Sequence, residues 1–223
     1  MKYLSVAVDG PAGSGKSTIT KMVASKLGFN YVDTGALYRT LTYSFLKHNL
    51  TELDNEKITK ILDTIDLRVD YEDGKQIVYL NNENVENNIR TAEVSKYTSL
   101  FATSSLVRDF LIDTQRNLAL SNNIIMDGRD IASVVLPNAD VKIFLTASVE
   151  ERAKRRFLEF QEKNSSTLTL EEVAEEIRKR DYQDENRKVA PLIKVPEAVL
   201  LDTTTMTIEE VVEKITNLIK EKQ

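Results

Sequence analysis

The stretch Tyr3-Leu-Ser-Val-Ala-Val-Asp-Gly-Pro-Ala-Gly-Ser-Gly-Lys-Ser17 joins an apolar run directly to the pattern Gly-x-x-x-x-Gly-Lys-Ser. An apolar run in this place predicts a buried strand, and a helix is expected to open at Ser17. The glycines allow successive backbone N–H groups to point into one concavity, toward which the helix also directs its positive dipole end. The stretch therefore predicts a phosphate-binding loop (P-loop) and a protein that uses a nucleoside triphosphate.

The spacing of the P-loop assigns roles to its last residues. Lys16 is expected to reach the β- and γ-phosphates, and the Ser17 hydroxyl to ligand Mg²⁺. The residues expected to bind ATP are Gly10, Pro11, Ala12, Gly13, Ser14, Gly15, Lys16, Ser17 and Thr18.

Composition limits the remaining possibilities. The chain has 223 residues, a net charge of −5 and no cysteine. The acidic balance argues against a general nucleic-acid surface, since such proteins collect excess Lys and Arg. No apolar stretch approaches the length of a membrane span, and the first residues lack a signal pattern. We therefore expect a soluble cytoplasmic protein that binds neither nucleic acid nor membrane. A monomer is expected, although composition does not determine the oligomeric state.

The single histidine, His48, is expected to lie at the end of a helix rather than in catalysis.

Strand and helix patterns alternate along the chain. Helices are expected at Ser17 to Leu27, Gly35 to Lys47 and Ser105 to Leu120, and capping-box patterns at Ser148, Thr169 and Thr207 predict later helices. This order predicts an α/β fold, a doubly wound parallel sheet of five strands with helices on both faces. The expected strands are Tyr3 to Val8, Asn30 to Val32, Ile124 to Met126, Val141 to Leu145 and Ala198 to Leu201.

Two segments interrupt the alternation. Leu67 to Val85 has the pattern of a small antiparallel meander with a turn at Asp73-Gly74, so it is expected to be an inserted subdomain. Glu151 to Lys179 is rich in charge and contains the linker-like Asn164-Ser-Ser, so it is expected to be a second, smaller insertion. We therefore expect a core of residues 1–39, 103–150 and 180–223, with insertions at 40–102 and 151–179.

A P-loop alone is compatible with a kinase, a GTPase switch or a motor. Several arginines follow predicted strands or flank carboxylates, and guanidinium groups gathered around one site suit a phosphate dianion and a phosphoryl group in transfer. Asp127 ends an apolar run, where a carboxylate holds Mg²⁺ through water in this architecture, although such an Asp can also cap a helix. The GTPase patterns Asp-x-x-Gly, after such a strand, and Asn-Lys-x-Asp do not occur. The arginines are Arg39, Arg108, Arg129, Arg180 and Arg187.

These motifs together resemble the bacterial cytidylate kinases, from Lys2 to about Lys214. The resemblance is carried by Gly10 to Thr18, Asp33 to Arg39, Ile89-Arg90-Thr91, Asp127 to Asp130 and Arg180 to Arg187. It implies transfer of a phosphoryl group from ATP to CMP or dCMP, with the insertion at 40–102 as a monophosphate-binding part and the insertion at 151–179 as a short helical lid. It also implies that Thr34, Arg108 and Asp130 contact cytosine, that Ser99, Arg180 and Asp184 contact the sugar, and that Arg39, Arg129 and Arg187 hold the phosphate. Some members have Ser at the position of Thr34, which keeps the hydroxyl.

The chemistry of the base agrees with these roles. Cytosine presents an amine donor and the acceptors N3 and O2, which acceptors at Asp130 and Thr34 and a donor at Arg108 complement. The lid arginines Arg152, Arg155 and Arg156 resemble residues that close over ATP, but the sequence does not say which of them touches phosphate. Two alternatives remain open: an ATP-cycling regulatory or nucleic-acid-binding module, and a kinase of another small metabolite.

Overall fold

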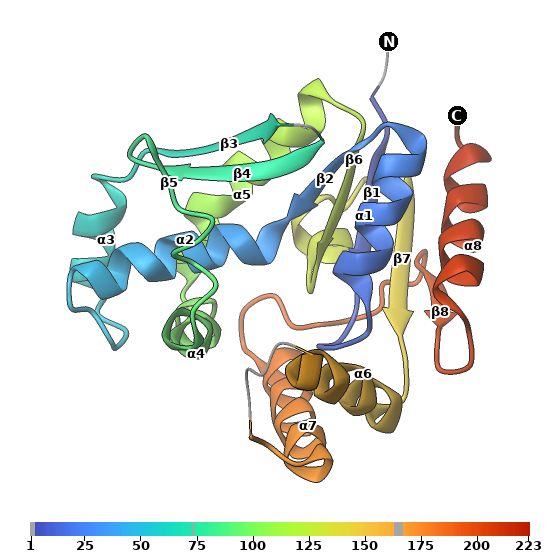
Figure 1. Cartoon of the computed structure of the whole chain (residues 1–223). Coiled ribbons are helices and arrows are strands. Elements are labelled where there is room, and N and C mark those ends of the chain that lie inside the picture. The colour runs from blue at the N-terminus through green and yellow to red at the C-terminus, as the bar shows by residue number, and fades with distance from the viewer. Residues whose placement is uncertain (1–2, 73, 163–166) are drawn as a thin grey trace. The chain divides into compact units, whose positions relative to one another are not determined.

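The computed structural model describes residues 3–72, 74–162 and 167–223 (Figure 1). The chain divides into two compact units. The first unit contains Tyr3 and Phe29–Ile124, and the second contains Leu4–Gly28 and Ile125–Gln223. No helix in these described ranges has the length and apolar character needed to cross a membrane.

Five strands form one sheet in the order β2-β6-β1-β7-β8. Its inner strands are nearly continuous apolar runs, as expected for parallel strands buried on both faces. β1 pairs in parallel with β7, with Val8 opposite Ile143, and β7 pairs in parallel with β8. The order reverses beside β1, which is where ligands bind in doubly wound sheets. The strands are β1 (Ser5–Asp9), β2 (Asn30–Asp33), β6 (Ile124–Gly128), β7 (Val141–Thr146) and β8 (Val199–Asp202).

The expected α/β class and all five expected core strands are confirmed, with boundaries shifted by a few residues. One difference is at the N-terminus, where β1 begins at Ser5 and Tyr3 is exposed. Tyr3 continues the apolar pattern of the sequence, but a pattern does not specify where the hydrogen-bonded partner strand ends.

In the second unit, helix α1 (Lys16–Leu27) follows the P-loop and packs against α8 (Ile208–Lys220) (Figure 1). Gly28 ends α1 in the left-handed conformation, φ 69°, and donates its N–H to the carbonyl of Ala24. The capping box predicted at Thr207 is present, because its side chain accepts from the N–H of Glu210 while the Glu210 carboxylate accepts from the N–H of Thr207.

Two further helices of the second unit, α6 (Val149–Glu162) and α7 (Leu170–Asn186), pack on each other around a small apolar core of their own. The capping box predicted at Thr169 is present at the start of α7. At Ser148 the hydroxyl accepts from the N–H of Glu151, but the Glu151 carboxylate accepts from Arg155. The predicted linker at 164–166 lies outside the described residues. The core of the pair is formed by Ala153, Val173, Ala174 and Ile177.

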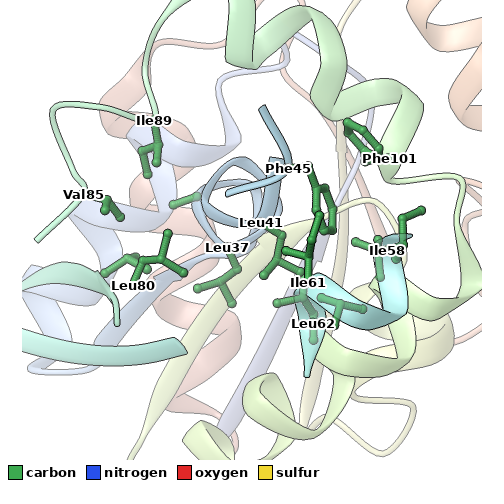
Figure 2. Packing of buried hydrophobic residues seen from close by; sticks show 14 of the residues in the cluster. Leu37, Leu41, Phe45, Ile58, Ile61, Leu62, Leu80, Val85, Ile89 and Phe101 are labelled. Atoms are coloured by element: carbon green, nitrogen blue, oxygen red, sulfur yellow. The ribbon is translucent and has the colours of Figure 1, made fainter. Parts of the chain in front are cut away.

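The first unit is built around helix α2 (Thr34–Lys47). Figure 2 shows Leu80 and Val85 on one side of this helix and Ile58 and Phe101 on the other. Phe101 meets Phe45 of α2 with the ring centroids 4.7 Å apart. The other helices are α3 (Asn55–Leu62), α4 (Ala92–Phe101) and α5 (Ser105–Ser121).

The predicted meander is confirmed as a three-stranded antiparallel sheet of β3 (Leu67–Glu72), β4 (Lys75–Leu80) and β5 (Glu83–Asn84). Asp73 of the predicted turn lies outside the described residues, whereas Gly74 adopts φ 73°.

His48 is the C-cap of α2, as expected, and its Nδ1 lies 2.8 Å from the carbonyl oxygen of Ser44.

The predicted division into core, monophosphate-binding part and lid is a different partition from the two compact units, and it stays a prediction. It concerns which segments move when substrates bind. Packing within each unit does not address that question.

The first testable prediction concerns the core of the first unit. Phe101→Ala should lower the free energy of unfolding by about 3–5 kcal/mol, because a fully buried ring is replaced by a cavity. Leu120→Ala, on the exposed face of α5, is the control and should change it by less than about 0.5 kcal/mol. Urea denaturation measures both, and similar losses in the two variants would contradict the packing described.

Candidate active site

The P-loop connects β1 to α1 along a path that depends on glycine. A Cβ on Gly10 would lie 2.0 Å from the carbonyl oxygen of Leu145 in β7, so no side chain fits there. Gly15, with φ 86°, is the N-cap of α1 and has no side-chain cap. The first N–H groups of α1 therefore have no side-chain acceptor at the N-cap, which is the arrangement that receives a phosphate.

Lys16 is buried at the start of α1, and its ammonium group lies against the backbone of the loop. Its Nζ donates to the carbonyl oxygens of Gly10 and Pro11, each at 2.7 Å, and to Ser14 Oγ at 3.2 Å. Burial lowers the pKa of Lys16 well below its usual value, and the positive charge of Arg129 lowers the pKa further, against the opposing effect of nearby carboxylates. A buried ammonium surrounded by neutral carbonyls gains strongly from an arriving anion.

Ser17 and Asp127 place two side-chain oxygens next to each other. Ser17 Oγ donates to Asp127 Oδ2 at 2.8 Å, and Asp127 is buried at the end of β6. The N-cap of the following π-helix, η1 (Ile131–Val135), is Asp130 and not Asp127. Among the described residues no group of three or more His, Cys, Asp or Glu could hold a metal alone.

A cluster of charged side chains connects α7 with the segment after β6. Arg129 Nε donates to Asp184 Oδ2 at 2.7 Å, and Arg187, the C-cap of α7, lies 3.8 Å from Asp184 Oδ1 and 3.5 Å from Asp130 Oδ1. Burial raises the pKa of Asp184, but Arg129, Arg180 and Arg187 together outweigh it and lower that pKa below its usual value. The structure thus brings together the five predicted substrate residues of the second unit.

The predicted substrate residues of the first unit lie on α2, α4 and α5. Asp33 caps α2 by accepting from the N–H of Ala36, and its other oxygen accepts from Arg39 Nη2 at 2.9 Å. Arg108 is buried and donates from Nε to the carbonyl of Ala102 at 2.8 Å. Its guanidinium carbon lies over the ring of Tyr38, 5.4 Å from the ring centroid. Thr34 is buried at the start of α2, and Ser99 is exposed on α4.

The three lid arginines differ in their surroundings. Arg152 is buried and bonded to backbone carbonyls and to Asp181. Arg155 donates to the carbonyl and hydroxyl of Thr203 and to Glu151, and its Nη1 would lie 3.9 Å from a Cβ on Gly15. Arg156 is exposed and pairs with Glu159.

Sequence reasoning missed Asp9, the last residue of β1. Its carboxylate is almost completely buried and accepts from the N–H groups of Ile131 and Ala132, each at 2.8 Å. It thereby fixes the segment that carries Arg129 and Asp130. Burial raises the pKa of Asp9 to about 6. The only signal in the sequence is a carboxylate between an apolar strand and Gly10.

The second testable prediction follows from the pKa of Asp9. The folded-state value, about 6, lies above the ordinary 3.8, so the folded state binds this proton more tightly. The resulting stability is complete below the unfolded-state pKa and is lost as the pH rises through 6. Relative to Asp9→Asn, the wild type should lose about 2 kcal/mol of unfolding free energy between pH 4 and 7.

Denaturation of both proteins across this pH range measures the difference. The lost hydrogen-bond acceptor in the variant adds an offset that does not depend on pH. Asp184→Asn is a control of opposite sign, because a lowered pKa contributes stability that is lost as the pH falls. A difference between wild type and Asp9→Asn that stays constant with pH would contradict the prediction.

Comparison with known proteins gives a consistent result. The family model described as Cytidylate kinase matches residues 6–221. A cytidylate kinase of Caldicellulosiruptor bescii is 46% identical, with 98% of this chain and 96% of the relative covered. One of Bacillus cytotoxicus is 47% identical, covering 99% and 97%. Among solved structures, an uncharacterized protein of Eubacterium ventriosum is similar in fold, with TM-score 0.53, 10% identity and 99% of both chains covered.

Proposed function

The chain belongs to the cytidylate kinase family, and we propose that it transfers the γ-phosphoryl group of MgATP to CMP or dCMP, giving ADP and CDP or dCDP. The observation that carries the proposal is the P-loop, where buried Lys16 and the pair of Ser17 and Asp127 adjoin a helix N-terminus without a side-chain cap. A triphosphate is the ligand that uses all three features.

In the proposed reaction the P-loop residues Gly10 to Thr18 hold the triphosphate by their backbone N–H groups. Lys16 exchanges its carbonyl partners for phosphate oxygens. Ser17 and Asp127 would hold Mg²⁺, which when bound neutralises charge on the phosphates.

We propose that the acceptor nucleotide binds through nine side chains. We assign Thr34, Arg108 and Asp130 to cytosine, and Ser99, Arg180 and Asp184 to the sugar. Arg39, Arg129 and Arg187 bind the phosphate. The support is chemical: the arginines offer planar donor pairs that suit phosphate oxygens, and two of them are already oriented by carboxylates.

The transfer requires little covalent chemistry from the protein. The attacking oxygen belongs to an ionised phosphate, so no general base is needed. Lys16, Arg39, Arg129 and Arg187 contribute by orienting both phosphates and by stabilising negative charge as it spreads over the transferred group. Uracil would place its O4 against acceptors, and a site built for hydrogen bonds rejects such a mismatch by up to about 10⁴-fold.

We also propose that the enzyme acts in the cytoplasm as a monomer and does not bind nucleic acid. The net charge of −5 disfavours nucleic-acid binding, and a chain without cysteine suits a reducing compartment. Light scattering with and without substrates tests the oligomeric state.

A coupled assay for ADP release, run over a panel of nucleoside monophosphates and small alcohols, tests the function. We expect CMP and dCMP to be the preferred acceptors and UMP to be used far less well. Preference for an alcohol would favour a kinase of another metabolite. ATP turnover that is independent of every acceptor would favour an ATP-cycling module.

The third testable prediction concerns Lys16. Lys16→Ala should lower kcat at least about 100-fold, because a charge that stabilises the transferring phosphoryl group is lost. Lys26→Ala, on an exposed position of the same helix, should keep wild-type turnover. The coupled assay and thermal denaturation are run on both, and near-normal turnover of a folded Lys16 variant would remove it from the reaction.

The fourth testable prediction concerns Asp184. Asp184→Ala should lower kcat/KM for CMP and dCMP by about 10–100-fold, since it removes a charged acceptor for the sugar and leaves Arg129 without its 2.7 Å partner. The KM for ATP should scarcely change. Neighbouring Glu185→Ala, which removes an exposed carboxylate, is the control.

Steady-state kinetics with both acceptors decide between a substrate contact and an internal ion pair. Unequal losses for CMP and dCMP identify the hydroxyl that Asp184 binds. Unchanged efficiency toward both acceptors would exclude Asp184 from the site.

A further inference from the structure

Ala12, in the middle of the P-loop, has both of its backbone polar groups bound by a single ion pair. Its carbonyl oxygen accepts from Arg152 Nη1 at 2.9 Å, and its N–H donates to Asp181 Oδ1 at 3.4 Å. The same Arg152 Nη1 lies 2.6 Å from Asp181 Oδ2. Arg152, Asp181 and the Ala12 backbone thus form a closed ring of contacts, which we call the Ala12 clamp.

The Ala12 clamp is anchored in three elements. Arg152 belongs to α6 and Asp181 to α7, and the two helices share the apolar core described above. Arg152 Nε also donates to the carbonyl of Ala147 at 2.9 Å, just after β7. The two side chains are only 5% and 13% exposed, so their contacts are screened little by water.

The loop and helix α6 also lie in direct contact beside the clamp. A Cβ on Gly13 would lie 3.4 Å from both Cβ and the carbonyl oxygen of Arg152. Gly13 adopts φ 73°, a conformation that glycine reaches without strain. The loop therefore follows the surface of α6 closely, with Arg152 at the point of contact.

A P-loop binds phosphate only while its N–H groups point in fixed directions, but its glycines give the backbone unusual freedom. Holding one residue of the loop at both its N–H and its carbonyl restricts that freedom before the ligand arrives. Preorganised donors bind more tightly because less order has to be created on binding.

We propose that Arg152 and Asp181 are positioning residues for ATP, which set the conformation of the P-loop through Ala12. The proposal rests on the proposed function, in which this loop binds ATP. It also separates Arg152 from the other lid arginines, because of the three only Arg152 is described in contact with the backbone of Ala12.

The direction in which one substitution changes the affinity for ATP distinguishes this positioning role from a simple effect of charge. A carboxylate near the loop repels a triphosphate, so on charge alone Asp181→Asn should tighten ATP binding. If the clamp positions the loop, the same substitution should weaken it, because an amide forms no ion pair with Arg152.

The fifth testable prediction therefore compares Asp181→Asn with Glu175→Gln. Both variants neutralise one carboxylate on α7, but Glu175 pairs with exposed Arg178 and is not part of the Ala12 clamp. We expect Asp181→Asn to raise the KM for ATP and the Kd for ADP about 10-fold while the KM for CMP changes less than about 2-fold. Glu175→Gln should leave all three unchanged.

Calorimetry with ADP and kinetics with both substrates supply these constants. Tighter or unchanged nucleotide binding by folded Asp181→Asn overturns the proposal, as does an equal rise in both KM values. Arg152→Lys, with Arg178→Lys as its control, provides the same comparison if Asp181→Asn does not fold. A wild type that binds ADP but does not phosphorylate CMP contradicts the proposed function, whereas the ADP comparison still tests the clamp.

Discussion

The approach of the P-loop to strand β7 is the constraint on which the second unit depends. A Cβ on Gly10 would lie 2.0 Å from the carbonyl oxygen of Leu145, and this crowding leaves room only for hydrogen. The loop can therefore turn from the end of β1 directly into α1. The N-terminus of that helix then points at the loop. A side chain at this position would push the loop away from the sheet, together with the carbonyls of Gly10 and Pro11 that accept from Lys16.

Several charges lie buried around this loop, and each is compensated in a different way. Lys16 is solvated by backbone carbonyls, Asp9 by two backbone N–H groups, and Asp127 by the Ser17 hydroxyl. Burial without such partners would be prohibitive, since an isolated ion is poorly solvated in a protein interior. The opposite shifts in the pKa values of Lys16 and Asp9 express the same cost, because burial disfavours the charged form of both.

How much could be predicted from the sequence depended on whether a feature is local. The P-loop and the core strands follow from short patterns, and the full capping boxes at Thr169 and Thr207 follow from residues three positions apart. Helices α3 and α4 were missed although Asp54 and Thr91 cap them, since neither has the Glu or Gln that completes a capping box.

The contacts that organise the site could not be predicted in the same way. Asp9 meets Ile131 across 122 positions, and Arg152 meets Ala12 across 140 positions. These pairings can be predicted only when the strand order is known, because they depend on the position of β1 between β6 and β7. The resemblance to a family implied roles for individual arginines, but not that carboxylates such as Asp33 and Asp184 pair with Arg39 and Arg129.

Those carboxylates explain why the arginines of the second unit can lie close together at low exposure. Arg129 is held by Asp184, as Arg39 is held by Asp33 within the first unit. Arg187 lies beside both Asp130 and Asp184, so its charge is also compensated within the fold. A guanidinium that already has a carboxylate partner has lost most of its rotamer freedom, so little more is lost when it binds a second anion. The same pairing offsets the mutual repulsion of the arginines, which allows the folded state to keep a high local density of phosphate-binding groups without a ligand.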